Sequence, residues 1–189
     1  MSPTGARHWS QIIAVILLTV GVAACTITRS KDPAVSSFQL ASPSTLDASV
    51  SAFQQLRLEQ GQLVRQFTLA LDIGADKLQL VIMSTIGQRL ATWRYSDNHY
   101  QLQIEAGAPT DLPYRLVLVA TQLVFWPIDA LGNANREDWR ISGTRVYYRD
   151  SLVAKLVRPP LQPTSWKGEY RVEFPTSNVT LELQSTQLF

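Results

Sequence analysis

The sequence has little cysteine and little histidine. Cys25 is the single cysteine, and His8 and His99 are the two histidines among 189 residues. One cysteine excludes an internal disulfide and a multi-cysteine metal cluster, and two histidines are too few for a histidine-rich metal site. The sequence also lacks Gly-x-Ser-x-Gly, a phosphate-cradling glycine loop and His-x-x-x-His. These absences remove several common enzyme signatures, and no metal or cofactor is expected.

The net charge is small, and no apolar run is long enough to span a membrane as a helix. Lys and Arg number 17 against 15 Asp and Glu, a net charge of +2, so no nucleic-acid partner is expected. The apolar run from Ile12 to Ala24 has 13 residues, whereas a helix that spans a bilayer needs about 20. Arg7 and His8 precede this run. A basic start, a short apolar middle and a small-residue end are typical of an export signal.

The end of that run carries a motif, Val22-Ala23-Ala24-Cys25. It resembles the bacterial lipobox, in which an aliphatic residue and two small residues precede an obligatory cysteine. The resemblance implies that residues 1–24 are a lipoprotein signal peptide and that Cys25 is acylated, which anchors the chain to a membrane. Thr26, where Asp would favour the inner membrane, implies the periplasmic face of the outer membrane. The alternative is an ordinary secretory signal that ends near a free cysteine.

Two segments of different composition follow the signal. Residues 25–48 are rich in Ser, Thr, Pro and Ala and have no apolar period, so they are predicted to be a flexible, lipid-anchored tether. Residues 49–189 have the length and apolar content of one globular domain. In this domain apolar and polar residues alternate from Leu63 to Ile73 and in three later runs, which end near Ile104. This alternation predicts antiparallel strands with one buried face.

One segment breaks the alternation. Thr110 and Asp111 are capping residues, and Pro113 follows them as a first-turn proline. From Leu112 to Trp126 the apolar residues fall at helical spacing, and only Arg115 and Gln122 are clearly polar. We predict a helix that is buried on several sides. A buried strand is the competing interpretation, because part of the segment is β-branched.

Beyond a polar loop predicted at 132–138, alternation resumes and continues toward the end of the chain. The whole pattern predicts about nine strands and one main helix. The expected fold is therefore mainly β (α+β): a curved antiparallel sheet or half-barrel that wraps one main helix.

Two short motifs stand at the beginning and the end of the predicted helical segment: Leu112-Pro113-Tyr114-Arg115-Leu116 and Gln122-Leu123-Val124-Phe125-Trp126-Pro127. Together with the strands and the lipobox, they resemble an uncharacterised family of small bacterial outer-membrane lipoproteins, often encoded beside aryl polyene biosynthesis enzymes. The likeness covers roughly residues 49–189. The order of elements is also similar to that of LolA and LolB, whose curved sheet wraps an apolar cavity closed by helices, but no LolB motif matches residue by residue.

Few residues suggest catalysis. His99 lies in a predicted turn, and acylation of Cys25 would remove its thiol as a nucleophile. The acidic pairs Glu137-Asp138 and Glu169 with Glu173 are more simply a solvated loop and the polar face of a strand. We therefore expect a protein that is not an enzyme.

The aromatic and apolar residues suggest binding instead. Trp93 and Trp139 are expected in the core, whereas Trp126 is expected either in the core or at a cavity mouth. The predicted cavity lies between helix and sheet, with these lining residues: Phe67, Trp93, Leu116, Val119, Leu123, Phe125 and Trp126.

The sequence thus favours a noncatalytic outer-membrane lipoprotein that binds or hands over an apolar lipid or acyl chain in the periplasm. An aryl polyene lipid or a lipoprotein is the expected ligand, and a periplasmic lipid or lipoprotein carrier is the expected partner. The alternative is a structural docking subunit of an envelope assembly, which would bind protein rather than lipid.

Overall fold

The computed structural model describes residues 33–96, 98–135, 137–157 and 168–188. They belong to one compact unit, Lys31–Phe189. The predicted signal peptide, Cys25, Thr26 and Trp166 lie outside the described residues. None of the described helices is both long and apolar enough to cross a membrane.

Ten antiparallel strands form a single sheet. The first five strands are β1 Val50–Gln60, β2 Leu63–Ile73, β3 Leu78–Met83, β4 Arg89–Ser96 and β5 His99–Ile104. The other five are β6 Trp139–Ser142, β7 Arg145–Tyr148, β8 Ser151–Val157, β9 Glu169–Phe174 and β10 Val179–Leu188. Their spatial order is β5-β4-β3-β2-β1-β10-β9-β8-β7-β6, so two meanders are joined where β1 pairs with β10. The sheet is not closed, and β5 and β6 are its edges.

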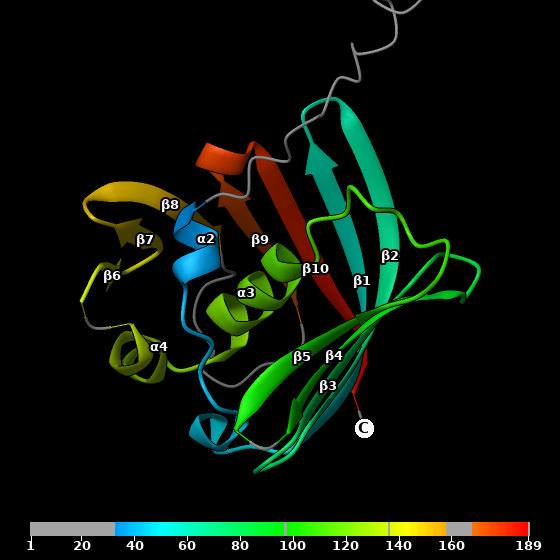
Figure 1. Cartoon of the computed structure of the whole chain (residues 1–189), viewed down its shortest axis with the longest axis horizontal. Coiled ribbons are helices and arrows are strands. Elements are labelled where there is room, and N and C mark those ends of the chain that lie inside the picture. Colours follow the sequence, from blue (N-terminus) through cyan, green and yellow to red (C-terminus); the bar gives the residue numbers. More distant parts are fainter. Residues whose placement is uncertain (1–32, 97, 136, 158–167, 189) are drawn as a thin grey trace, which may run out of the picture. The chain divides into compact units, whose positions relative to one another are not determined.

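The alternating pattern explains which face of the sheet is buried. In β2 the side chains of Phe67, Leu69, Leu71 and Ile73 are buried, and those between them are more exposed. Because β1 pairs with β2 in register, Leu56 lies opposite Phe67 on the same face. Helix α3, Tyr114–Phe125, lies across this face, which we call the inner face (Figure 1). The predicted mainly β architecture around one main helix is confirmed.

The segment from Leu112 to Trp126 forms a helix rather than a strand. Ten consecutive or near-consecutive side chains of α3 are buried, including Leu118 and Ala120 at 0% exposure. Pro113 occupies the position before the helix without a side-chain cap, so the expected capping by Thr110 or Asp111 is not observed. Asp111 instead accepts a hydrogen bond from Arg65 of β2, with 2.9 Å between Nη1 and Oδ1.

A second helix was not expected. Helix α4, Ile128–Ala134, occupies part of the predicted polar loop. Leu131 is its buried residue, at 1% exposure, and packs in the same core as α3. The helix forms although Gly132 and Asn133 are weak helix formers, because tertiary packing of one apolar side chain compensates for low propensity.

The predicted tether differs from the structure in its second half. Residues 33–46, which we call the strap, contain helix α2, Pro33–Ser37, and the 3₁₀ turn η1, Pro43–Leu46. Phe38 and Ala41 are 1% and 3% exposed and belong to the core. Within the described residues, the strap is therefore part of the folded unit and not a flexible spacer.

Candidate functional site

The predicted cavity-lining side chains come together on the inner face, but they are packed there as core. Phe67, Trp93, Leu116, Val119, Leu123 and Trp126 are all at most 6% exposed. Phe125 is partly buried, and its ring meets that of Tyr170 edge to face, with 5.3 Å between centroids. Two surface grooves stand out among the described residues, and neither is lined by α3.

Hydrogen bonds hold the two candidate tryptophans in place. The indole Nε1 of Trp93 donates to the backbone oxygen of Tyr114 at 3.1 Å. That of Trp126 donates to the backbone oxygen of Ser42 at 3.2 Å. Trp93 therefore joins β4 to the first turn of α3, and Trp126 joins the end of α3 to the segment 33–46 that precedes the sheet. Trp126 lies in the core rather than at an opening.

Apolar side chains reach the surface at one edge of the inner face. Leu102 and Ile104 of β5 lie opposite Trp93 and Ala91 of β4, so they point to the same face as these core residues. Yet Leu102 is 36% and Ile104 50% exposed. The difference arises because β5 is an edge strand: among the strands that the structure describes, none lies beyond it to flank these side chains.

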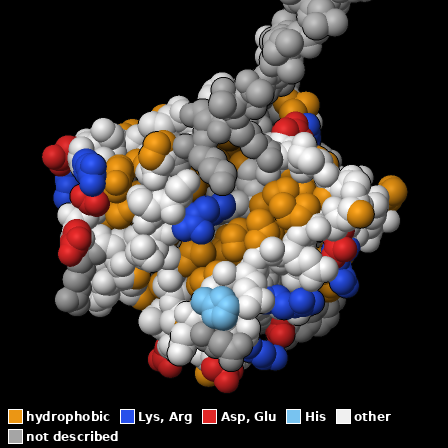
Figure 2. Space-filling model, viewed as in Figure 1, with side chains coloured by type: hydrophobic (Ala, Val, Ile, Leu, Met, Phe, Trp, Pro, Cys, Tyr) orange, Lys and Arg blue, Asp and Glu red, His pale blue; other side chains and the backbone are white. Residues whose placement is uncertain are grey.

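We call this region, between β5 and α3, the apolar mouth. Trp93 links it to the helix, because its indole contacts the first turn of α3 and its strand neighbour is Leu102. Figure 2 shows hydrophobic side chains gathered in a hollow on this side of the molecule. Contiguous exposed apolar patches often serve as interaction sites, so we take the apolar mouth as the candidate site.

The strap crosses the same region. The backbone oxygen of Ala41 accepts hydrogen bonds from Tyr100 Oη of β5 at 2.7 Å and from Gln122 Nε2 of α3 at 2.9 Å. The amide of Ala41 donates to Gln122 Oε1 at 2.9 Å, and Gln122 Nε2 also lies 2.7 Å from Tyr100 Oη. Burial raises the pKa of the Tyr100 phenol, so it stays protonated and remains a donor.

Two further polar residues attach the strap. Asn135 accepts from the amide of Gln39 at 2.7 Å and donates to its oxygen at 2.8 Å. Arg115 donates to the oxygens of Val35 and Phe38, at 3.0 and 2.7 Å, near the end of α2. Burial lowers the pKa of this guanidinium, but an arginine stays charged in proteins. Cationic donors suit the free carbonyls at a helix C-terminus.

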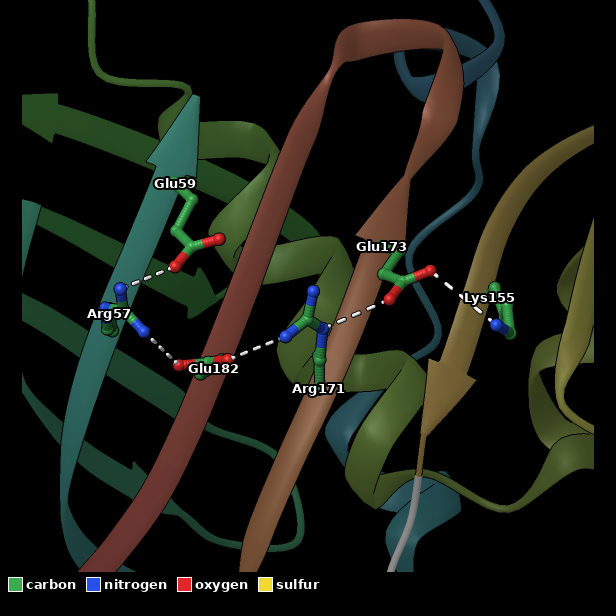
Figure 3. Close-up of polar contacts among 6 residues, drawn as sticks. All are labelled: Arg57, Glu59, Lys155, Arg171, Glu173 and Glu182. Atoms are coloured by element: carbon green, nitrogen blue, oxygen red, sulfur yellow. Dashed lines mark hydrogen bonds and ion pairs between the residues drawn. The ribbon is translucent and has the colours of Figure 1, made fainter. Parts of the chain in front are cut away.

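The opposite, outer face carries a groove of about 820 Å³ across β2, β1, β10, β9 and β8, which is lined by both polar and apolar residues. Figure 3 shows a row of ion pairs on this face, of which Arg57, Arg171 and Glu182 also line the groove. Arg57 and Arg171 each contact Glu182, with N–O distances of 3.2 and 3.0 Å. Arg171 also contacts Glu173, which reaches Lys155. The three acidic side chains of the row, completed by Glu59 beside Arg57, therefore balance its three basic ones.

The other residues considered for catalysis have ordinary surroundings. Glu169 accepts a hydrogen bond from Gln184 at 3.1 Å, and Asp138 pairs with Arg149 at 3.0 Å. His99 Nε2 lies 2.7 Å from Gln101 Nε2 on the exposed part of β5. Among the described residues, no three His, Cys, Asp or Glu side chains cluster closely enough to hold a metal ion. No acid–base pair is assembled by these residues.

Comparison with known proteins identifies the family. Residues 51–187 match the family model described as a protein of unknown function, DUF3261. The chain belongs to this family. The matched region of this DUF3261 protein runs from β1 into β10 and so includes all of the sheet except its first and last residues, together with α3 and α4. No curated protein matches the DUF3261 chain.

Sequence reasoning missed the mouth and the residues of the strap that border it. One signal was present: Gln122 is a polar residue in a helix that is otherwise apolar, and it is 0% exposed. A buried amide needs partners, so its position predicts a polar backbone nearby. The exposure of Leu102 and Ile104 had no comparable signal, because it depends on the place of β5 in the sheet.

Proposed function

We propose that this DUF3261 protein is a noncatalytic lipoprotein, anchored through Cys25 to the periplasmic face of the outer membrane, that binds or hands over an apolar lipid or acyl chain. The observation that carries the proposal is the apolar mouth: Leu102 and Ile104 share the face of the core and are nevertheless exposed. Covering such side chains is favourable by about 25 cal/mol for each Å² of apolar surface removed from water.

The mouth fits an alkyl chain better than a polar ligand. The neighbouring inner-face side chains, Trp93 and Ala91, are apolar, and α3 contributes apolar residues to the same core. The side chains predicted to line a cavity are tightly packed, so the ligand would first contact the mouth and lie along β5. An aryl polyene lipid or the acyl chains of a lipoprotein have this chemistry, and a periplasmic carrier similar to LolA would be the expected partner.

The same strand supports the alternative, a docking subunit of an envelope assembly. Within the described part of the chain, the outer edge of β5 has no neighbouring strand, and such an edge can pair with a strand of another protein. Native mass spectrometry of the purified protein distinguishes the two functions: co-purified lipid supports the first, and a protein partner without lipid supports the second.

The direct test measures binding of a fluorescently labelled hexadecanoic acid to the chain from Thr26 to Phe189, which contains every described residue. Ile104→Gln places a polar group in the mouth and should weaken binding about five- to tenfold. Val64→Gln is the matched control, because Val64 is 49% exposed against 50% for Ile104 but lies on the outer face of β2. Equal losses in both variants, or no binding by the wild type, would contradict the proposal.

A further inference from the structure

The strap bridges the two sides of the mouth through a single peptide group. The oxygen of Ala41 contacts Tyr100 on β5 and Gln122 on α3. Tyr100 lies on the inner face of β5, in the same alternating row as Leu102 and Ile104. The strap therefore joins the strand that forms one side of the mouth to the helix that forms the other.

The contacts of this stretch differ from those on either side of it. Phe38 before it is 1% exposed and Pro43 after it is buried, so both ends are held by apolar packing. Between them, Gln39 is exposed and Leu40 only partly buried. Ala41 buries its methyl group in the core, at 3% exposure. The other attachments of the stretch are hydrogen bonds to Asn135, Gln122 and Tyr100 and, at Ser42, to Trp126. Because the methyl group of Ala41 is the one fully buried apolar group of this stretch, its local opening depends mainly on these hydrogen bonds.

We propose that residues 39–42 act as a latch across the apolar mouth, and that breaking the contacts of Ala41 with Tyr100 and Gln122 widens the path by which an acyl chain reaches the inner face. This inference rests on the proposed function and adds its regulation. When the latch opens, the ends held by Phe38 and Pro43 stay in place, and the direct contact between Gln122 and Tyr100 is the bridge that remains between α3 and β5.

The experiment uses Tyr100→Phe in the chain from Thr26 to Phe189. The substitution removes the hydroxyl that donates to Ala41 and accepts from Gln122, and it keeps the ring, which packs against Tyr95 with 4.8 Å between centroids. Of these two hydrogen bonds, the one to Ala41 holds the strap. One neutral hydrogen bond changes an equilibrium about fivefold, so the open fraction should rise by that factor. Stopped-flow measurement with fluorescently labelled hexadecanoic acid should show association about five times faster. The reason is that only molecules with an open latch bind the probe, so the apparent association rate and the apparent affinity rise with the open fraction.

Tyr114→Phe is the matched control. It removes a similar phenol hydrogen bond, to the backbone oxygen of Pro109 at 2.8 Å, which does not involve the strap. Its association rate should stay within about twofold of the wild type. Hydrogen exchange of the Ala41 amide, measured without any probe, should be about five times faster in Tyr100→Phe and unchanged in Tyr114→Phe.

The outcomes separate the latch from the proposed function. Binding with equal association rates and equal Ala41 exchange in all three proteins would overturn the latch and leave the function standing. Faster association in both variants would also overturn it, because the effect would then not depend on the strap. No binding of the probe by any of the three would overturn the proposed function and the latch together.

Discussion

Phe38 and Trp139 meet edge to face, with ring centroids 5.0 Å apart and ring planes at 85°. One ring belongs to the strap and the other to β6, an edge strand of the sheet. Edge-to-face pairs contribute about 0.5–1.5 kcal/mol beyond the area that they bury. This contact joins the beginning of the folded unit to the edge that is farthest in the sheet from β5.

Phe38→Ala should destabilise the protein by about 3–5 kcal/mol, as removal of a buried aromatic ring does. The reason is that Phe38 is 1% exposed and part of the core. Urea denaturation of the chain from Thr26 to Phe189 measures the change. Gln39→Ala, which keeps the backbone contacts with Asn135, should remain close to wild type. A denaturation midpoint equal to that of the wild type for Phe38→Ala would contradict the assignment of the strap to the folded core.

Leu116→Ala should cost about 2–5 kcal/mol, because it leaves a cavity where α3 packs on the sheet. Leu116 is 6% exposed, whereas Ile86, on the turn between β3 and β4, is 87% exposed. Ile86→Ala should therefore change stability by less than about 0.5 kcal/mol. Thermal or urea denaturation compares the two, and similar effects at both positions would contradict the buried position of Leu116.

Ser51→Ala should destabilise the protein in a pH-dependent way. The hydrogen bond from Ser51 at 2.8 Å, helped by Lys77, lowers the pKa of Asp72 in the folded state. A lowered folded pKa stabilises the fold above the unfolded pKa, and this stability is lost as the pH falls through the folded pKa. Because Asp72 is half exposed, the effect should stay below about 1 kcal/mol.

The measurement is the urea midpoint of unfolding, taken between about pH 3 and 7, because carboxylates titrate in the acid part of this range. The gap between wild type and Ser51→Ala should be widest near neutral pH and narrow toward the acid end. Asp72→Asn supplies the control, since without the carboxylate the added Ser51→Ala change should have the same effect at every pH. A gap that grows on acidification would show that another group controls it.

Cys25→Ala should abolish incorporation of a clickable palmitate, because under the proposal the Cys25 thiol takes the diacylglyceryl group through a thioether and the new amino terminus of Cys25 is acylated. The unprocessed chain should keep residues 1–24, which mass spectrometry of the membrane fraction detects. Thr26→Ala leaves the cysteine in place and should still be labelled. Label on Cys25→Ala would refute lipid attachment at this position.

The strands and the main helix could be predicted from the sequence because their signals are local. Alternation places Leu69 and Leu71 on one face of a strand, and helical spacing places Leu116 and Leu123 in a buried helix. Helix α4 could not be predicted in the same way. Its single buried anchor, Leu131, is surrounded by residues typical of turns.

The strap and the mouth depend on contacts between distant parts of the chain. Ala41 and Gln39 are held by Gln122 and Asn135, more than 80 positions away, so the composition of residues 33–46 contains no sign of them. The exposure of Ile104 follows from strand order, which alternation alone does not determine. The residues predicted to line a cavity therefore lie together on the inner face as buried core, and the exposed side chains of β5 were not among them.

The pairing of β1 with β10 has a consequence for how the chain reaches its native state. These strands come from opposite ends of the domain and meet at the middle of the sheet. Until β10 has been delivered, β1 has β2 as its single strand partner and β9 has an open side, so the two meanders cannot merge. Pairing across such long sequence separations is slow, and unpaired strand edges promote aggregation. A chain without β10 would keep two half-sheets, each with an unpaired inner edge, rather than a slightly smaller domain. We therefore expect the sheet to be completed late in folding, when β10 pairs with β1.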